Sequence, residues 1–139
     1  MVLAEDDDGH ALLVTKNIER AGHAGRVVRL RDGREAIDYF HGAGSVDRPS
    51  PCVLLLDINL PHVNGIDVLA RLKGTASTAS LPIVMLTTTD DPRDVARCYD
   101  LGCNVYVQKP VVYDQLVEAI HRLGQFLAVI QVPKDVARR

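Results

Sequence analysis

The residues Val53-Leu54-Leu55-Leu56-Asp57-Ile58-Asn59-Leu60-Pro61 are the part of this sequence that most clearly indicates its fold. Four aliphatic residues run directly into a carboxylate, and Pro61 then ends the segment. An unbroken apolar run of this length is typical of a strand buried on both faces of a sheet. Its carboxyl end lies at the edge where open α/β sheets bind ligands. Taken alone, Asp57 indicates only a strand that ends at solvent, so its meaning depends on the other strand ends.

The composition is that of an ordinary globular protein. The chain has 139 residues, of which 47% are hydrophobic and 24% charged, and its formal net charge is −2. These values fit one domain with a real core, and they provide no general attraction to nucleic acid or to an anionic membrane. The apolar runs are too short to span a bilayer, and an acidic cluster begins five residues into the chain. We therefore expect neither a membrane segment nor a signal peptide.

The cysteines and histidines show no spacing that indicates a metal site. Cys52, Cys98 and Cys103 are an odd number of cysteines without a CxxC pair. We expect them to be reduced and mostly buried thiols in a cytoplasmic protein. The five histidines lack both an HxxxH pair and a nearby cysteine, and we interpret them as surface or loop residues.

Apolar strands and amphipathic helices alternate along the chain. Strands are predicted at residues 1–4, 26–30, 52–56, 82–87 and 104–107, and helices begin near Asp7 or Asp8, Gly33, Ile66, Asp91 and Val112. The segment Asp91-Pro92-Arg93-Asp94 is a strong helix start, because a capping Asp precedes a Pro at the first helical position. This alternation predicts an α/β fold with a single doubly wound sheet of parallel strands, covered by helices on both faces.

One domain is expected to span residues 1–132. Residues 42–51 form a long loop with two prolines, and the last helix is expected to end near Ile130, before Pro133. Residues 133–139 are a basic tail, of which we expect Lys134 to Arg139 to be disordered.

Reactive side chains end or follow four of the predicted strands. Glu5 and Asp6 follow the first strand, Asp57 the third, Thr87 ends the fourth and Lys109 follows the fifth. Parallel strands end at the same edge of a sheet, so these groups should gather there. Neighbouring carboxylates repel one another, and a divalent cation such as Mg²⁺ relieves that repulsion. An Asp beside such a cation can attack phosphorus, while a Lys and a hydroxyl stabilise the charge of the transferred group.

These motifs, in this order, resemble those of the response regulator receiver domain, the phosphoacceptor module of two-component signalling. The resemblance covers nearly the whole chain and rests on Glu5-Asp6, on residues 56–61 with Asn64-Gly65, on residues 81–87 and on residues 105–110. It implies a flavodoxin-like (βα)5 sheet with strand order 2-1-3-4-5. It also implies a signalling protein that is phosphorylated by a sensor histidine kinase and catalyses only its own phosphorylation and dephosphorylation.

The resemblance implies a role for each matching residue at the phosphorylation site. Asp57 is the phosphoacceptor, and Lys109 pairs with the phosphoryl group. Glu5, Asp6 and Asp57, with the backbone carbonyl of Asn59, hold Mg²⁺ or Mn²⁺. The first acid is Glu where many family members have Asp, which moves that carboxylate outward by one methylene.

The resemblance also implies a conformational switch. Thr87 and Tyr106 form the switch pair, and the peptide bond between Lys109 and Pro110 is cis, which is a habit of bonds that precede proline in tight turns. Thr88 stands where many members have a smaller residue, so access to the phosphate is expected to be narrower. Read from the residues alone, a packing role for Tyr106 and an ordinary strand threonine at Thr87 remain as less favoured alternatives.

Finer features resemble the small stand-alone regulators of bacterial phytochrome kinases. They are the loop at residues 42–51, the run of threonines at 87–89, and Phe126-Leu127 followed by Val132-Pro133. The last helix carries an apolar stripe and is expected to run about two turns past strands of ordinary length. An exposed apolar patch of this kind predicts a homodimer. The predicted interface residues are Leu116, Ile120, Leu123, Phe126, Leu127 and Ile130.

Other functions fit the sequence less well. A phosphatase of the haloacid dehalogenase type needs a second acid two residues after the nucleophile, where this chain has Asn59. A flavodoxin needs a phosphate loop after the first strand, where this chain has acids. A phosphorelay intermediate and a degenerate receiver that only binds partners remain as alternatives. The sequence identifies neither the cognate kinase nor the downstream target.

Overall fold

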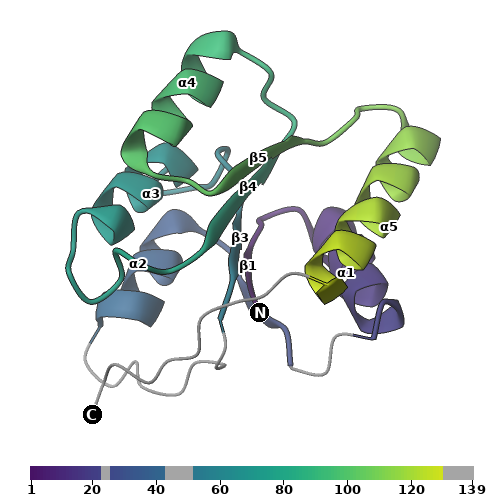
Figure 1. Ribbon diagram of the computed structural model, residues 1–139, viewed down its shortest axis with the longest axis horizontal. Coiled ribbons are helices and arrows are strands. Elements are labelled where there is room, and N and C mark those ends of the chain that lie inside the picture. The colour runs from purple at the N-terminus through teal and green to yellow at the C-terminus, as the bar shows by residue number, and fades with distance from the viewer. Residues whose placement is uncertain (23–25, 43–51, 130–139) are drawn as a thin grey trace.

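The computed structural model describes residues 1–22, 26–42 and 52–129. Strands and helices alternate through these residues, as predicted (Figure 1). In chain order they are β1 (Val2–Ala4), α1 (Asp8–Arg20), β2 (Val28–Leu30), α2 (Gly33–His41), β3 (Leu54–Leu56), α3 (Gly65–Lys73), β4 (Ile83–Thr87), α4 (Pro92–Leu101), β5 (Val105–Gln108) and α5 (Tyr113–Val129). The predicted boundaries differ from the observed ones by one or two residues at most strand ends, which is the usual uncertainty of a sequence pattern.

The five strands form one parallel sheet in the order β2-β1-β3-β4-β5. This confirms the predicted strand order. The register pairs Ala4 with Leu56, so Glu5 and Asp57 are the next residues on two neighbouring strands. Thr87 is paired with Gln108, the last residue of β5. Lys109 is therefore the next residue of that strand at the same edge of the sheet. Strand register alone thus brings the predicted reactive residues to one edge of the sheet.

Both faces of the sheet are buried, as the apolar run in β3 predicts. Leu54 and Leu56 point into a core shared with α2, α3 and α4, while Val53 and Leu55 point into a second core shared with α1 and α5. Figure 1 shows the helices in the same two groups, with α1 and α5 on one side of the sheet and α2, α3 and α4 on the other. The helices therefore cover both faces of the sheet, and the carboxyl ends of the strands lie at its edge between the two helical layers.

The last helix packs along α1 as far as Leu127, so most of the stripe predicted as an interface is covered by this chain itself. Gly124 explains the close approach, because a Cβ atom there would lie 2.9 Å from the backbone oxygen of Asn17 on α1. Four predicted interface residues are core residues of this chain, and they are Leu116, Ile120, Leu123 and Leu127. Phe126 stays exposed, whereas Ile130 lies outside the described residues.

The loops at the carboxyl edge are fixed by side chains that cap the next helices. Asp7 caps α1 by accepting a hydrogen bond of 2.9 Å from the backbone N–H of His10, so Asp7 rather than Asp8 is the cap. Asn64 caps α3 in the same way through the N–H of Asp67, and Asp91 caps α4. Each cap satisfies a backbone donor that the helix leaves unpaired. The loops that carry the acidic residues are therefore ordered by local contacts.

Three remaining expectations concern the rest of the chain. Cys52, Cys98 and Cys103 are buried thiols, as predicted, and burial raises the pKa of Cys98 to about 11. The predicted basic tail at residues 133–139 lies outside the described residues. No helix within residues 1–22, 26–42 and 52–129 has the length and apolar character needed to cross a membrane.

Candidate functional site

The carboxyl edge of the sheet brings three carboxylates together. Glu5 and Asp6 follow β1, Asp57 follows β3, and one oxygen of each lies within 4.8 Å of the others. Glu5 and Asp57 are only 2% and 6% exposed, whereas Asp6 faces solvent. Oxygen ligands from two buried carboxylates and one exposed carboxylate suit a hard divalent cation that keeps part of its water shell. The residues present therefore fit Mg²⁺ or Mn²⁺, with access from the side of Asp6.

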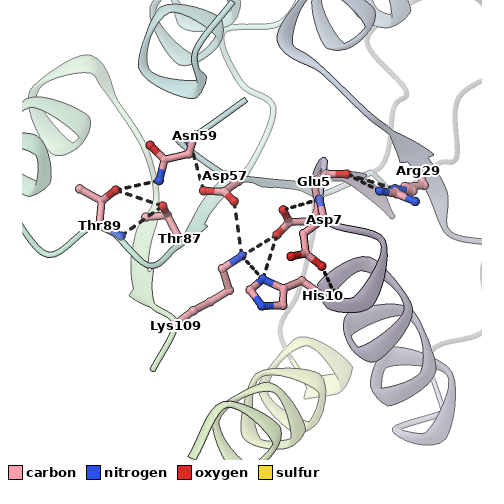
Figure 2. A network of polar contacts seen from close by, with 9 residues as sticks. All are labelled: Glu5, Asp7, His10, Arg29, Asp57, Asn59, Thr87, Thr89 and Lys109. Atoms are coloured by element: carbon pink, nitrogen blue, oxygen red, sulfur yellow. Dashed lines mark hydrogen bonds and ion pairs between the residues drawn. The ribbon is translucent and has the colours of Figure 1, made fainter. Parts of the chain in front are cut away.

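Lys109 supplies the positive charge at the centre of this cluster. Its Nζ atom lies 2.5 Å from Oε1 of Glu5 and 3.4 Å from Oδ2 of Asp57, and its side chain is only 1% exposed (Figure 2). A buried ammonium is tolerated only when it is paired and hydrogen-bonded. In this structure Lys109 offsets the charge of the two buried carboxylates, with the closer contact to Glu5.

The carboxylate of Glu5, which the extra methylene carries farther from the main chain, is buried within the site. Its longer side chain reaches Lys109 through Oε1, while Oε2 accepts a hydrogen bond of 3.2 Å from the backbone N–H of Asp7. Burial raises the pKa of Glu5 to about 7; the hydrogen bond from Lys109 opposes this shift, and the charge of Asp57 adds to it. The extra methylene of Glu5 is therefore used to contact Lys109.

His10 belongs to the site, although its spacing in the sequence gave no indication of it. It lies in the first turn of α1, and its Nδ1 atom is 3.1 Å from Nζ of Lys109 and 3.9 Å from Oε1 of Glu5 (Figure 2). The interpretation of all histidines as surface or loop residues is wrong for this one. Side chains in a helix point back toward its N-terminus, so a residue in the first turn after the acidic pair could have been expected to face the strand ends.

Asn59 and Thr89 extend the site away from Lys109. The backbone N–H of Asn59 donates to Oδ1 of Asp57 at 3.2 Å, and its side-chain amide donates to Oγ1 of Thr89 at 3.2 Å. Thr89 was not predicted as a site residue; the sequence had drawn attention to its neighbour Thr88. Since a strand ends at Thr87, only the path of the following loop decides which threonine returns to the site.

Thr89 also joins the two residues of the predicted switch pair. Its backbone N–H donates to Oγ1 of Thr87 at 3.4 Å, and its backbone oxygen accepts a hydrogen bond of 2.7 Å from the hydroxyl of Tyr106. Burial raises the pKa of Tyr106 to about 12, so this hydroxyl remains protonated and can donate. Thr87 is fully buried, and its backbone oxygen accepts a hydrogen bond of 2.6 Å from the N–H of Lys109. Thr87, Tyr106 and Lys109 thus share one connected set of hydrogen bonds.

The backbone at both acidic strand ends is held by neighbouring residues. Gly65 lies so close to β3 that a Cβ atom there would be 2.0 Å from the backbone oxygen of Asp57, which explains the glycine in this motif. The guanidinium of Arg29 donates two hydrogen bonds to the backbone oxygen of Glu5, at 3.1 and 2.9 Å, and a third of 2.6 Å to Asp8. Both carboxylates are therefore presented from fixed main-chain positions.

Comparison with known proteins identifies what this arrangement resembles. The family model for the response regulator receiver domain matches residues 1–121. The crystal structure of a response regulator receiver domain from Rhodospirillum rubrum is 46% identical, with a TM-score of 0.88 and 96% of each chain covered. The match to the family extends over the whole sheet and includes the three carboxylates and Lys109.

Two further response regulators are similar to this chain. One has a structure with Mn²⁺ bound, and the other is a phytochrome response regulator. Response regulator Rcp1 of Synechocystis is 30% identical over 96% of this chain and 92% of its own length, and its Mn²⁺-bound structure superposes with a TM-score of 0.88. The phosphorylated cyanobacterial phytochrome response regulator RcpA is 30% identical, with a TM-score of 0.85 and coverage of 95% of this chain and 96% of its own. The phytochrome resemblance inferred from the sequence is confirmed at the level of similarity.

We expect Mg²⁺ to stabilise the folded protein, and to do so more strongly as the pH rises. At about ten times its Kd, a cation that binds only the folded state adds about 1.4 kcal/mol to the free energy of unfolding. Because the pKa of Glu5 is raised to about 7, a proton competes with the cation for this carboxylate at lower pH. Urea unfolding with and without Mg²⁺ should show a larger gain at about pH 8.5 than at about pH 5.5.

Without added cation, the effect of Glu5 has the opposite sign. The folded protein holds the Glu5 proton up to about pH 7 and the unfolded chain only up to about 4.5, so this residue lowers stability as the pH rises through that window. Asp6→Asn is the matched variant, because it removes the exposed ligand and leaves the buried pair intact. An equal Mg²⁺ gain at both pH values, or an unchanged gain in Asp6→Asn, would contradict the proposed ligand set.

Proposed function

The chain belongs to the response regulator receiver family, and from this we propose that it accepts a phosphoryl group from a sensor histidine kinase on Asp57. The observation that carries the proposal is the position of Asp57, at the end of the central strand, within 4.8 Å of two other carboxylates and 3.4 Å from Lys109. Similarity to Rcp1 and RcpA supports a kinase of the phytochrome type. We place the protein in the cytoplasm, where its three buried cysteines would remain reduced.

The proposed reaction is a transfer from phosphohistidine to aspartate. An oxygen of Asp57 forms a bond to phosphorus while the phosphorus–nitrogen bond breaks, and the imidazole leaves with the electron pair. When bound by Glu5, Asp6 and Asp57, Mg²⁺ or Mn²⁺ would offset the charge on the phosphoryl oxygens. Lys109 gives up its 3.4 Å contact with Asp57 and donates to a phosphoryl oxygen instead. This contact stabilises the negative charge on the phosphoryl group and so favours the transfer.

We propose that the signal leaves the site through Thr89. A phosphoryl oxygen on Asp57 would attract the hydroxyl of Thr87, which now accepts a hydrogen bond from the N–H of Thr89. Loss of that bond would move the loop whose backbone oxygen holds the hydroxyl of Tyr106. A local hydrogen-bond change at Thr87 would in this way alter the surface formed by α4, β5 and α5.

We propose that this surface mediates homodimerisation through the exposed side of α5. Phe126 and Val129 are 46% and 75% exposed, and they lie three residues apart on one face of the helix. A second copy of the same chain is a suitable partner, because a two-fold contact pairs one apolar patch with itself. The proposed interface differs from the sequence prediction in that Leu116, Ile120, Leu123 and Leu127 support it from the core.

Two other functions remain testable within the same family. A phosphorelay intermediate would pass the phosphoryl group from Asp57 to a histidine of another protein. A degenerate receiver would bind partners without being phosphorylated, but the three clustered carboxylates, with Lys109 in contact with Glu5 and Asp57, favour a competent site. Apart from its own phosphorylation and dephosphorylation, we propose no enzymatic activity.

Asp57 should be essential for binding a phosphoryl analogue. Beryllofluoride with Mg²⁺ should bind the wild-type protein in ¹⁹F NMR, because it mimics a phosphoryl group on a carboxylate oxygen, and Asp57→Asn should abolish the signal. Asp100→Asn, which changes an exposed carboxylate at the end of α4, is the control and should bind normally. Binding by Asp57→Asn at the wild-type level would rule out this residue as the acceptor.

Activation should change the backbone around the two switch residues. In ¹H–¹⁵N spectra, addition of beryllofluoride and Mg²⁺ should shift residues 87–101 and 104–109 most strongly, because Thr89 connects Thr87 to Tyr106. Tyr106→Phe removes the hydroxyl that contacts Thr89 and should reduce the shifts within β5 while leaving those at Asp57. Shifts confined to α1 and α2 would contradict this route.

Dimerisation should depend on the exposed face of α5. In sedimentation at micromolar concentration, the wild-type protein should be dimeric, and Phe126→Glu combined with Val129→Glu should be monomeric, because paired charges would be buried at the contact. Leu127 is unsuitable for this test because it is a core residue. Leu12→Glu places a charge on the exposed side of α1 and should remain dimeric. A wild-type protein that is monomeric both in the absence and in the presence of beryllofluoride would exclude the proposed dimer.

A further inference from the structure

The ammonium of Lys109 has three acceptors, and one of them is an imidazole. An ammonium carries three N–H donors and no acceptor. Around Nζ of Lys109 lie Oε1 of Glu5 at 2.5 Å, Nδ1 of His10 at 3.1 Å and Oδ2 of Asp57 at 3.4 Å. With its side chain 1% exposed, Lys109 has little opportunity to replace any of them by water. His10 therefore completes the coordination of the buried cation.

The contact specifies the state of the imidazole. Because Lys109 can only donate, Nδ1 of His10 must accept, so the proton of the neutral ring is on Nε2. The main chain of His10 is held at the start of α1, since its N–H donates to the capping carboxylate of Asp7 at 2.9 Å. One edge of the ring thus faces Lys109, while 29% of the side chain stays exposed.

We propose that His10 is a positioning residue for phosphoryl transfer and holds the ammonium of Lys109 at the mouth of the site. The inference rests on the function proposed above. A divalent cation would compete with Lys109 for Glu5, and an arriving phosphoryl group would replace its contact with Asp57. His10 is neutral, and neither the cation nor the phosphoryl group replaces it as a partner of Lys109. The contact between His10 and Lys109 can therefore persist while the two carboxylates change partners. The ammonium of Lys109 is then already positioned to contact a phosphoryl oxygen, so its flexible four-carbon side chain does not have to be ordered during the transfer.

A direct role of His10 as a metal ligand fits the geometry less well. Among the described residues, the group whose ligand atoms all lie within 4.8 Å of one another contains Glu5, Asp6 and Asp57 and does not include His10. The nearest distance from Nδ1 of His10 to this group is the 3.9 Å contact with Glu5, and the same nitrogen faces Lys109. The ring acts on the site through Lys109.

Substitution of His10 tests the positioning role. His10→Leu removes the acceptor, whereas His10→Asn keeps an oxygen near the position of Nδ1. With acetyl phosphate and Mg²⁺, His10→Leu should be phosphorylated about tenfold more slowly than wild type because it loses the hydrogen bond to the ammonium, and His10→Asn should react within about threefold of the wild-type rate. His121→Leu removes an exposed histidine on α5 and should react at the wild-type rate. Equal rates for His10→Leu and wild type, or equal losses in His10→Leu and His10→Asn, would overturn the proposal.

A second measurement does not depend on phosphorylation. In long-range ¹H–¹⁵N spectra at about pH 8, His10 should be the Nε2–H tautomer, and its Nδ1 resonance should shift when Lys109→Met removes the donor. An Nδ1–H tautomer would overturn the contact and with it the inference. If wild type shows the expected tautomer but accepts no phosphoryl group from any donor, the proposed function fails and the phosphotransfer role fails with it, while the Lys109 contact stands.

Discussion

A buried lysine held between two buried carboxylates is the constraint on which this structure depends. Removing charges from water costs several kcal/mol per ion, and that cost is offset only when the partners are close and fully hydrogen-bonded. Glu5, Asp57 and Lys109 come close enough to pair because they follow β1, β3 and β5, which are joined in register through β4 in one parallel sheet. Packed apolar residues would stabilise the same edge more simply. The charges are therefore best explained by chemistry at that edge.

Much of this arrangement could be predicted from the sequence because it depends on periodicity and strand order. The aliphatic run at residues 53–56 predicts a strand buried on both faces, and the two cores confirm it. In a parallel sheet every carboxyl end lies at the same edge, so finding acids after two strands and a Lys after another was enough to predict the cluster. The predicted strand order is also the observed one.

The parts that could not be predicted depend on which side chains meet across elements. His10 enters the site through the first turn of α1, and Thr89 does so through a loop whose path no local pattern encodes. Gly124 lets α5 lie against α1, so a stripe that suggested a dimer interface is core instead. In each case the deciding contact joins residues far apart in the chain. Helical spacing identifies an apolar face but not the surface that covers it.

The most direct test is to locate the phosphoryl group chemically. After brief reaction with a phosphodonor and Mg²⁺, borohydride would reduce an aspartyl phosphate to homoserine, and peptide mass spectrometry would identify the position. We expect homoserine at residue 57 and at no other, and none when a chelator removes the cation. Homoserine at Asp6, Asp7 or Asp8, or its absence from a protein that is folded and supplied with Mg²⁺, would contradict the assignment of Asp57 as the phosphoacceptor.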